Sequence, residues 1–364
     1  MRKILRYILM SVVSVLAFAG CDVHFFPKDE GDLVPFMLHL DFSTEMPLYK
    51  EVVYTRGDED ATRNPQPDHD VRYIVNAYRT DNVAGESRIP DTTFVFTKPD
   101  VETLDYSALI EIPEGEYTFR VWCDYVDEGS KADKYYNTSD FSEIILADRK
   151  NHSGSNDYRD AFRGTVSATV INPLLYPGAA QEAIDNQARV EMKRPMGKYK
   201  FVSTDVEGFI VNLAKKMQER GLISPDVDTK LGYEHVQEAF NIHEYYVKFR
   251  YSAFMPCSYN IFTDKPADSW TNMTYLSNMY IENGDQMAMG FDYIFVNGVE
   301  TTLSISLEVY DKEGELVSST NPIQVPVVRS KLTLVTGEFL TSMANGGVAI
   351  DPSYDGDDYN VEIF

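Results

Sequence analysis

Apolar residues recur at every second position in many segments of this 364-residue chain, and this alternation limits its fold more than any other feature. The clearest case is the segment 244–254. One of its faces is aromatic or aliphatic, and the other carries Tyr246, Lys248, Arg250 and Ser252. A period of two with one dry and one wet face is typical of an antiparallel sheet. The pattern therefore predicts an all-β chain.

Segments of this kind are rich in aromatic and β-branched residues and are separated by turn residues. They are predicted at 33–42, 71–78, 92–97, 116–124, 141–146, 189–202, 244–254, 291–296, 301–310, 323–328 and 331–336. The segment 189–202 is either a strand pair or one bulged strand, because Pro195 and Gly197 interrupt it. One helix is predicted after Asp205, because apolar residues recur there at helical spacing until Gly221, and Asp205 is expected to cap it. Two runs of strands with one helix predict two β-sandwich domains in tandem.

The first 20 residues predict a secretory signal peptide. Basic residues precede an apolar run, 8–19, that is short for a membrane span. Ala19 and Gly20 are small residues of the kind that a signal peptidase needs, and Cys21 follows them. This order resembles a bacterial lipobox, with Phe18 where Leu is usual. We therefore expect export and attachment of acyl chains at Cys21, against the alternative of an ordinary secretory signal with an incidental cysteine.

Charge and cysteine content narrow the class of protein. The leader carries three basic residues and no acidic one, which leaves 30 basic against 57 acidic residues and a net charge of −27. Such a chain repels nucleic acid and anionic lipid surfaces, so neither is an expected partner. Cys123 and Cys257 cannot supply a disulfide framework. Cys123 lies on the apolar face of its predicted strand, so we expect a buried thiol.

The composition and the predicted elements divide the chain into six segments. They are a signal peptide (1–20), a lipid-proximal tether (21–32), an N-terminal β-sandwich (33–172), a linker (173–188), a C-terminal β-sandwich (189–345) and an acidic tail (346–364). Pro and Gly residues mark the linker and the tether. The tail ends in alternating Val361 and Ile363, so it either donates a strand to a partner or frays.

Motifs of catalysis and metal binding are missing from the sequence. His235 and His243 have no cysteine or glutamate pair beside them, so zinc is not expected. Asp355, Asp357 and Asp358 lack the spacing of an EF-hand. The sequence contains no nucleophile elbow, phosphate-binding glycine loop or HExxH motif. We therefore expect neither enzymatic activity nor a cofactor or metal ion.

The aromatic content is the remaining feature that bears on function, with 24 Tyr, 20 Phe and 2 Trp. Exposed aromatic rings can stack on sugars, and tyrosine is also a good strand residue that packs between sheets. The candidates for glycan contact are Trp122, Tyr135, Tyr136, Trp270 and Tyr275.

Three segments and the lipobox carry a resemblance to a known family. The segments are Pro113–Trp122 (PEGEYTFRVW), Arg194–Phe201 (RPMGKYKF) and Lys331–Leu340 (KLTLVTGEFL). Together they resemble the fimbrillin-like lipoproteins of the Bacteroidales, which are pilus subunits and pilus-anchoring proteins. The resemblance covers most of the mature chain, and its motifs are structural rather than catalytic. It implies two transthyretin-like β-sandwiches, a surface-exposed lipid anchor in the outer membrane, and assembly with other subunits or copies by strand addition.

In that family, stalk subunits lose an N-terminal strand by cleavage after a basic residue, and a neighbour's strand fills the groove. Here the resemblance implies that 33–42 is the removable strand and that Arg56 or Arg63 is the scission point, in or beside an acidic loop. Without cleavage the chain keeps its lipid and is an anchor or an adhesin. The alternative is a glycan-binding outer-membrane lipoprotein of a polysaccharide-uptake system, with host or dietary glycans as partners.

Overall fold

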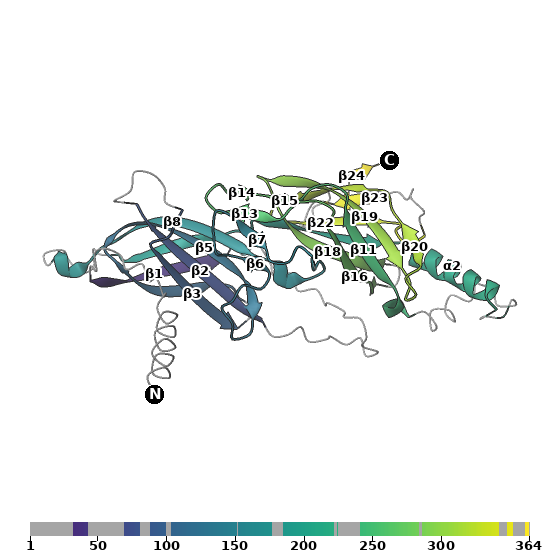
Figure 1. Cartoon of the computed structure of the whole chain (residues 1–364), viewed down its shortest axis with the longest axis horizontal. Helices are drawn as coiled ribbons and strands as arrows, with labels where there is room; N and C mark the ends of the chain where they lie inside the picture. Colours follow the sequence, from purple (N-terminus) through teal and green to yellow (C-terminus); the bar gives the residue numbers. More distant parts are fainter. Residues whose placement is uncertain are drawn as a thin grey trace, which may run out of the picture.

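The computed structural model describes residues 32–42, 69–80, 88–99, 103–150, 152–176, 185–221, 224, 241–283, 286–341, 348–351 and 361–363. Across these ranges the chain is all-β with a single α-helix, which confirms the fold class predicted from the alternation. Figure 1 shows an elongated molecule, with the strands of the first half of the chain at one end and those of the second half at the other.

Two facing sheets make up the first half of the molecule, with the strand orders β4-β1-β9 and β3-β2-β5-β8. The strands are β1 (Leu33–Phe42), β2 (His69–Arg79), β3 (Thr92–Pro99), β4 (Tyr106–Pro113), β5 (Gly115–Asp127), β8 (Phe162–Val170) and β9 (Gln187–Met192). Their inward side chains share one hydrophobic core. At its centre, Phe36 of β1 stacks on Phe119 of β5 with 5.4 Å between ring centroids. We call this unit the first sandwich.

A second pair of sheets, with its own hydrophobic core, makes up the other end of the molecule. One sheet has the order β17-β18-β10-β22-β23-β24, and the other has the order β16-β11-β19-β20, with β21 also paired to β19. The strands are β10 (Met196–Ser203), β11 (Tyr246–Tyr251), β16 (Thr274–Asn278), β17 (Tyr280–Asn283), β18 (Gln286–Phe295), β19 (Glu300–Tyr310), β20 (Leu316–Ser319), β21 (Ile323–Val328), β22 (Leu332–Gly337), β23 (Val348–Asp351) and β24 (Val361–Ile363). We call this unit the second sandwich.

Short strands connect the two sandwiches. They form the sheets β14-β13-β7-β6 and β12-β15. Their bounds are β6 (Tyr136–Asn137), β7 (Ile144–Leu146), β12 (Met255–Pro256), β13 (Ser258–Asn260), β14 (Lys265–Pro266) and β15 (Ser269–Trp270). Because β7 from the first half of the chain pairs with β13 from the second, backbone hydrogen bonds cross the junction. Three 3₁₀ turns complete the described elements, namely η1 (Asp157–Arg159), η2 (Pro173–Leu175) and η4 (Ile242–Glu244).

Of the two alternatives for 189–202, the structure has the strand pair, and its two strands lie in different sandwiches. β9 runs parallel to β1, with Leu38 opposite Ala188 and Leu40 opposite Val190. The chain then crosses the junction through 193–195, and β10 pairs with β18 and β22 of the second sandwich. We expected the C-terminal unit to begin at residue 189, but the residues of β9 belong to the first sheet by hydrogen bonding. The division into two domains otherwise stays a prediction.

The predicted helix is α2 (Val206–Glu219), and it buries Val206, Phe209, Ile210 and Ala214 as an amphipathic stripe. Its predicted cap has a different role, because the side chain of Asp205 makes no capping hydrogen bond. The Asp205 carboxylate instead accepts hydrogen bonds from the backbone N–H of Thr341 at 2.7 Å and from its hydroxyl at 2.6 Å. Asp205 therefore fixes the chain after β22 against the start of α2.

The C-terminal tail extends the chain's own sheet. β23 pairs antiparallel with β22, and β24 pairs antiparallel with β23. The tail was predicted to donate a strand to a partner or to fray. In the described residues both of its strands are used within the same chain.

Candidate functional site

The first strand, β1, lies between two neighbours and is the candidate site for strand exchange. Val34, Phe36 and Leu38 face Ile112, Ile110 and Ala108 of antiparallel β4. On the other side β9 pairs only from Met37 onward, so the beginning of β1 has no partner strand on that side within the described residues. Pro35 lies in this part of β1, where the missing N–H of proline breaks no ladder bond to β9.

The inward face of β1 fills the centre of the first sandwich. Val34, Phe36, Leu38 and Leu40 are buried, with exposed fractions of 0 to 2%. Burial of one such side chain contributes about 1.5–3 kcal/mol, so the four contribute about 6–12 kcal/mol. A whole domain is stable by only about 5–15 kcal/mol. The first sandwich therefore needs a strand in this position, either β1 or a replacement with the same alternation.

The outward face of β1 is polar and connects both neighbouring strands. Nδ1 of His39 lies 2.9 Å from the Ser107 hydroxyl of β4, and Nε2 lies 3.1 Å from the side-chain oxygen of Gln187 of β9. Arg189 pairs with Asp41 at 2.9 Å. These contacts are exposed to water, so they contribute to register more than to stability. The apolar face holds β1 in place, and the polar face sets its alignment.

A polar clamp holds the two sandwiches together, and sequence reasoning missed it. The segment 152–160 lies between β7 and β8. Its polar and charged side chains contact residues of β10 and β18 and of the connection that precedes β10. Nε2 of His152 lies 2.7 Å from Asp292, and Arg159 forms an ion pair with the same carboxylate. We call this set, together with the ion pairs Lys198 to Asp157 and Arg194 to Asp160, the junction clamp.

Electrostatics in the junction clamp follow from burial. Burial alone would raise the pKa of Asp292, but the Arg159 guanidinium beside it holds this pKa below its usual range. Burial lowers the pKa of His152, and Arg159 lowers it further. His152 therefore stays neutral at physiological pH and accepts or donates as an uncharged ring. Asp292 remains ionised in a buried position, with Arg159 as its counter-charge.

Two predicted site regions lie outside the described residues. Cys21, the expected lipid attachment point, and Arg56 and Arg63, the expected scission points, belong to this group. Within the residues that the structure covers, no group of three or more His, Cys, Asp or Glu side chains is arranged to hold a metal ion. The same part of the chain contains no helix that is long and apolar enough to cross a membrane.

Four of the five aromatic residues expected to contact glycans are buried. Trp122, Tyr136, Trp270 and Tyr275 are at most 8% exposed. The Trp122 indole N–H donates to Asp124 at 3.1 Å, and the Tyr275 hydroxyl donates to the backbone oxygen of Phe291 at 3.1 Å. A buried ring has no free face for a sugar, so these four do not form a glycan surface. Tyr135 is partly buried, and its hydroxyl lies 2.9 Å from a ring nitrogen of His69.

Both cysteines of the described region are free and buried, so the expected buried thiol of Cys123 is confirmed. Burial raises the pKa of Cys123 well above its usual value and that of Cys257 to about 12. The two sulfurs lie in different hydrophobic cores, which explains why no disulfide joins them.

Within the described residues the chain is all-β, with two hydrophobic cores and a first strand that lies between two neighbouring strands. The chain belongs to DUF6562, a family of unknown function, whose family model matches residues 35–363. A search of the curated proteins finds no match.

Solved structures with a similar arrangement come from Bacteroidales. One is the fimbrial anchor protein Mfa2 from Porphyromonas gingivalis, with 12% identity, a TM-score of 0.40, and coverage of 91% of this chain and 100% of that one. Another is a fimbrial assembly protein from Parabacteroides distasonis, with 10% identity, a TM-score of 0.37, and coverage of 91% and 99%. A third is a candidate polysaccharide-binding protein from Bacteroides thetaiotaomicron, with 9% identity, a TM-score of 0.44, and coverage of 90% and 98%.

Proposed function

We propose that this protein is a surface-exposed lipoprotein of the fimbrillin type, held in the outer membrane through Cys21. It serves as a structural or anchoring component of a pilus or adhesin that assembles by strand addition. The observation that carries the proposal is the position of β1, which is central, apolar on alternate residues and followed by a segment that contains Arg56 and Arg63. The proposed function is non-enzymatic.

The chemistry of strand addition matches the geometry of β1. A donor strand gains affinity from main-chain hydrogen bonds to β4 and β9 and gains specificity from alternate side chains. The pockets now filled by Val34, Phe36, Leu38 and Leu40 accept an alternating apolar strand. If a protease cuts after Arg56 or Arg63, the lipid and β1 stay together on the small fragment, and the large fragment gains the groove. If the chain stays intact, β1 closes the groove and the protein is an anchor.

The decisive experiment is mass spectrometry of the protein extracted from its native membrane. An N-terminus at an acylated Cys21 identifies an anchor, and an N-terminus just after Arg56 or Arg63 identifies a polymerising subunit. A chain that begins at an unmodified residue near position 21 would contradict lipid attachment and cleavage together.

A strand-exchange assay tests the groove directly. A protease site is engineered into 43–68, the chain is cut, and the β1 fragment is displaced by excess peptide of sequence 33–42. We expect exchange with this peptide and none with the matched peptide that carries Phe36→Asp and Leu38→Asp. Equal exchange with both peptides would contradict recognition by the apolar pockets.

A second candidate function, glycan binding, rests on an open depression at the junction. Its volume is about 500 Å³, and it is lined by Phe254 and Pro256 together with Asp268, Asn297 and Glu300, among others. The Phe254 ring is 69% exposed, and polar side chains surround it. An exposed ring beside hydrogen-bonding groups suits a neutral sugar.

A glycan array that compares the mature protein with Phe254→Ala tests this candidate. Leu276→Ala is the control, because Leu276 is similarly exposed at 63% but does not line the depression. Selective binding that is lost only in Phe254→Ala would favour the glycan function. Binding to no sugar class would leave the structural function as the better explanation.

A further inference from the structure

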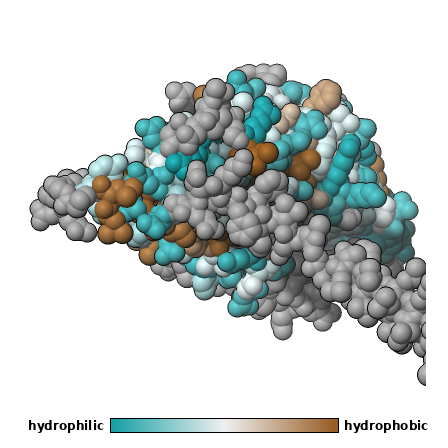
Figure 2. Space-filling view, turned by 60° about the vertical axis from the view of Figure 1, so that its left-hand side comes forward, coloured by the Kyte–Doolittle hydropathy of each residue, from teal (hydrophilic) through white to brown (hydrophobic). Residues whose placement is uncertain are grey.

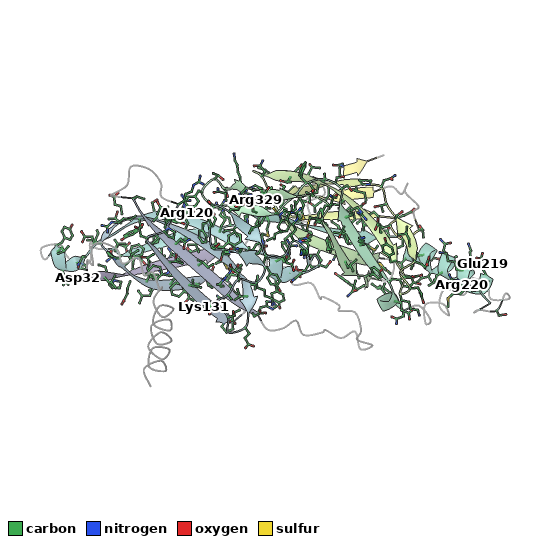
Figure 3. The ribbon with its side chains drawn as sticks, viewed as in Figure 1. Asp32, Arg120, Lys131, Glu219, Arg220 and Arg329 are labelled. Atoms are coloured by element: carbon green, nitrogen blue, oxygen red, sulfur yellow. The ribbon has the colours of Figure 1, made fainter. Side chains whose placement is uncertain are left out.

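The outer end of the first sandwich carries an apolar loop, η2 with Tyr176. Leu174 and Leu175 are 79% and 62% exposed, and Tyr176 is 49% exposed. Leu33, the first residue of β1, lies at the same end and is also exposed. Figure 3 labels Asp32 at this end of the molecule, and Figure 2, which turns this end forward, shows apolar surface there. We call Leu33, Leu174, Leu175 and Tyr176 the apolar tip.

The loop that carries the apolar tip is held in a fixed conformation. Asn172 caps η2 by accepting a hydrogen bond from the Leu174 N–H at 3.1 Å, and Pro173 begins the turn. Glu114 binds the loop from the β4–β5 turn, accepting from the Asn172 N–H at 2.9 Å and from the Tyr176 hydroxyl at 3.3 Å. The leucines therefore project from a supported turn, and their exposure is a property of the fold.

The residues of the apolar tip come from segments that meet at one end of the first sandwich. Leu33 pairs with Pro113, and the next turn leads into Gly115, which pairs with Val170. Asn172 follows two residues later and binds Glu114. The start of β1, the β4–β5 turn and η2 thus meet at one place, and α2 lies at the opposite end of the molecule (Figure 1).

The lipid attachment point is close to this end along the chain. Eleven residue steps separate Cys21 from Asp32. A fully extended tether of this length spans at most about 40 Å, and a flexible one averages roughly 20 Å. Acyl chains at Cys21 therefore keep the start of β1, and with it the apolar tip, beside the membrane surface.

Acidic side chains at this end disfavour anionic headgroups, although Arg79 lies there too, beside Gly115. Asp32 and Asp185 are exposed there, and Glu114 supports the loop. A lipid surface with no net charge instead suits two exposed leucines and a tyrosine, because the leucines enter the acyl boundary and the tyrosine ring lies at headgroup level.

We propose that the apolar tip is a membrane-docking surface, which inserts Leu174 and Leu175 into a zwitterionic lipid surface. This inference rests on the proposed function, because it takes lipid attachment at Cys21 as given. It goes beyond that function by fixing an orientation. The long axis stands away from the membrane, and the second sandwich, with α2 and the C-terminal strands, points outward.

Fluorescence of a label at position 175 tests the orientation. The full mature protein carrying Leu175→Cys is labelled with an environment-sensitive maleimide and reconstituted in phosphatidylcholine vesicles that contain a spin-labelled lipid quencher. Cys123 and Cys257 are buried, and the Cys21 sulfur is occupied by its thioether, so the label goes to the new thiol. Leu316→Cys is the matched control, because Leu316 is 51% exposed on β20 in the second sandwich.

We expect the emission of the label at 175 to shift to shorter wavelength and to be quenched by the lipid, and the label at 316 to do neither. Mass spectrometry of the same sample separates the two ways to fail. An acylated Cys21 with an unquenched label at 175 overturns the docking surface and leaves the anchor intact. An unmodified Cys21 overturns the anchor and the orientation together. A shift at 175 that appears without vesicles and grows with protein concentration also overturns the proposal, because a second copy then covers the tip.

Discussion

Replacement of Phe36 by alanine is the most direct measure of how much β1 contributes to the first sandwich. The Phe36 side chain is fully buried and stacks on Phe119 with 5.4 Å between ring centroids. Truncation of such a ring removes its burial and leaves a cavity, which together cost about 3–5 kcal/mol. This is a large share of the stability of one domain, about 5–15 kcal/mol. Phe36→Ala should therefore leave the first sandwich folded in water but much less stable.

Urea unfolding of the chain from residue 22, followed by circular dichroism, measures this loss. With two separate cores the unfolding can take two steps, and only the step of the first sandwich should shift. At an m-value of about 2 kcal/mol/M, the midpoint of that step should fall by about 2 M. His39→Ala is the matched control on the same strand, because its contacts with Ser107 and Gln187 are exposed and it should cost less than about 1 kcal/mol.

The outcome that refutes this reasoning is equal destabilisation by Phe36→Ala and His39→Ala. A loss below about 1 kcal/mol for Phe36→Ala would have the same meaning, because a dispensable ring at this position is inconsistent with the cavity cost of a packed core. The groove would then not need an apolar strand, and strand addition at β1 would lose its energetic basis.

The junction clamp and the buried thiols give three more expectations. Asp292→Asn should destabilise the chain by about 3–5 kcal/mol in urea unfolding, and Arg159→Met with Asp292→Asn should recover part of this loss, because the single change leaves a buried guanidinium unpaired. Burial and Arg159 lower the pKa of His152, so the unfolded chain binds more protons than the folded one below about pH 6.5. The unfolding free energy should fall from pH 7 to pH 5, and less in His152→Gln. No thiol of the chain from residue 22 should react with a disulfide reagent in buffer, and Cys123 and Cys257 should both react in urea.

Many strand positions could be predicted from the sequence, although β4, β8 and β16 were missed and the strand expected at 141–146 is only Ile144–Leu146. The strand expected at 33–42 has those bounds in the structure, and so does the strand expected at 323–328. Alternation is a local property of the sequence, so it can be recognised without knowledge of the tertiary structure. Pairing is not local. The break at Pro195 and Gly197 allowed a strand pair, but nothing in the pattern of β9 shows that it runs parallel to β1 while β10 enters another sheet.

The junction clamp was invisible in the sequence for a similar reason. The segment 152–160 is polar and reads as a loop, and the partner of His152 and Arg159 is Asp292, more than 130 residues away. The aromatic residues led to a different error, because rings that were expected to be exposed are buried. The hydroxyl of Tyr199 forms hydrogen bonds with those of Tyr251 and Tyr275 inside the second core. The polar hydroxyl of a tyrosine is therefore no sign that its ring is exposed. Burial of a polar atom depends on a partner that the sequence does not identify.

The junction clamp also has a consequence for the proposed function. If the chain is the lipid-held anchor proposed above, force passes from the tether at β1 to the second sandwich. The direct covalent link between the units is the three residues 193–195 between β9 and β10, which alone would act as a hinge. Pairing of β7 with β13 adds a second connection, and the buried pair of Arg159 with Asp292 adds a third. A buried ion pair adds little net stability compared with apolar packing, but it tolerates few geometries. We therefore expect the clamp to restrict the angle between the sandwiches. A chain in which apolar residues replace this pair should stay folded with a more variable angle, which small-angle scattering would detect as a wider distribution of molecular lengths.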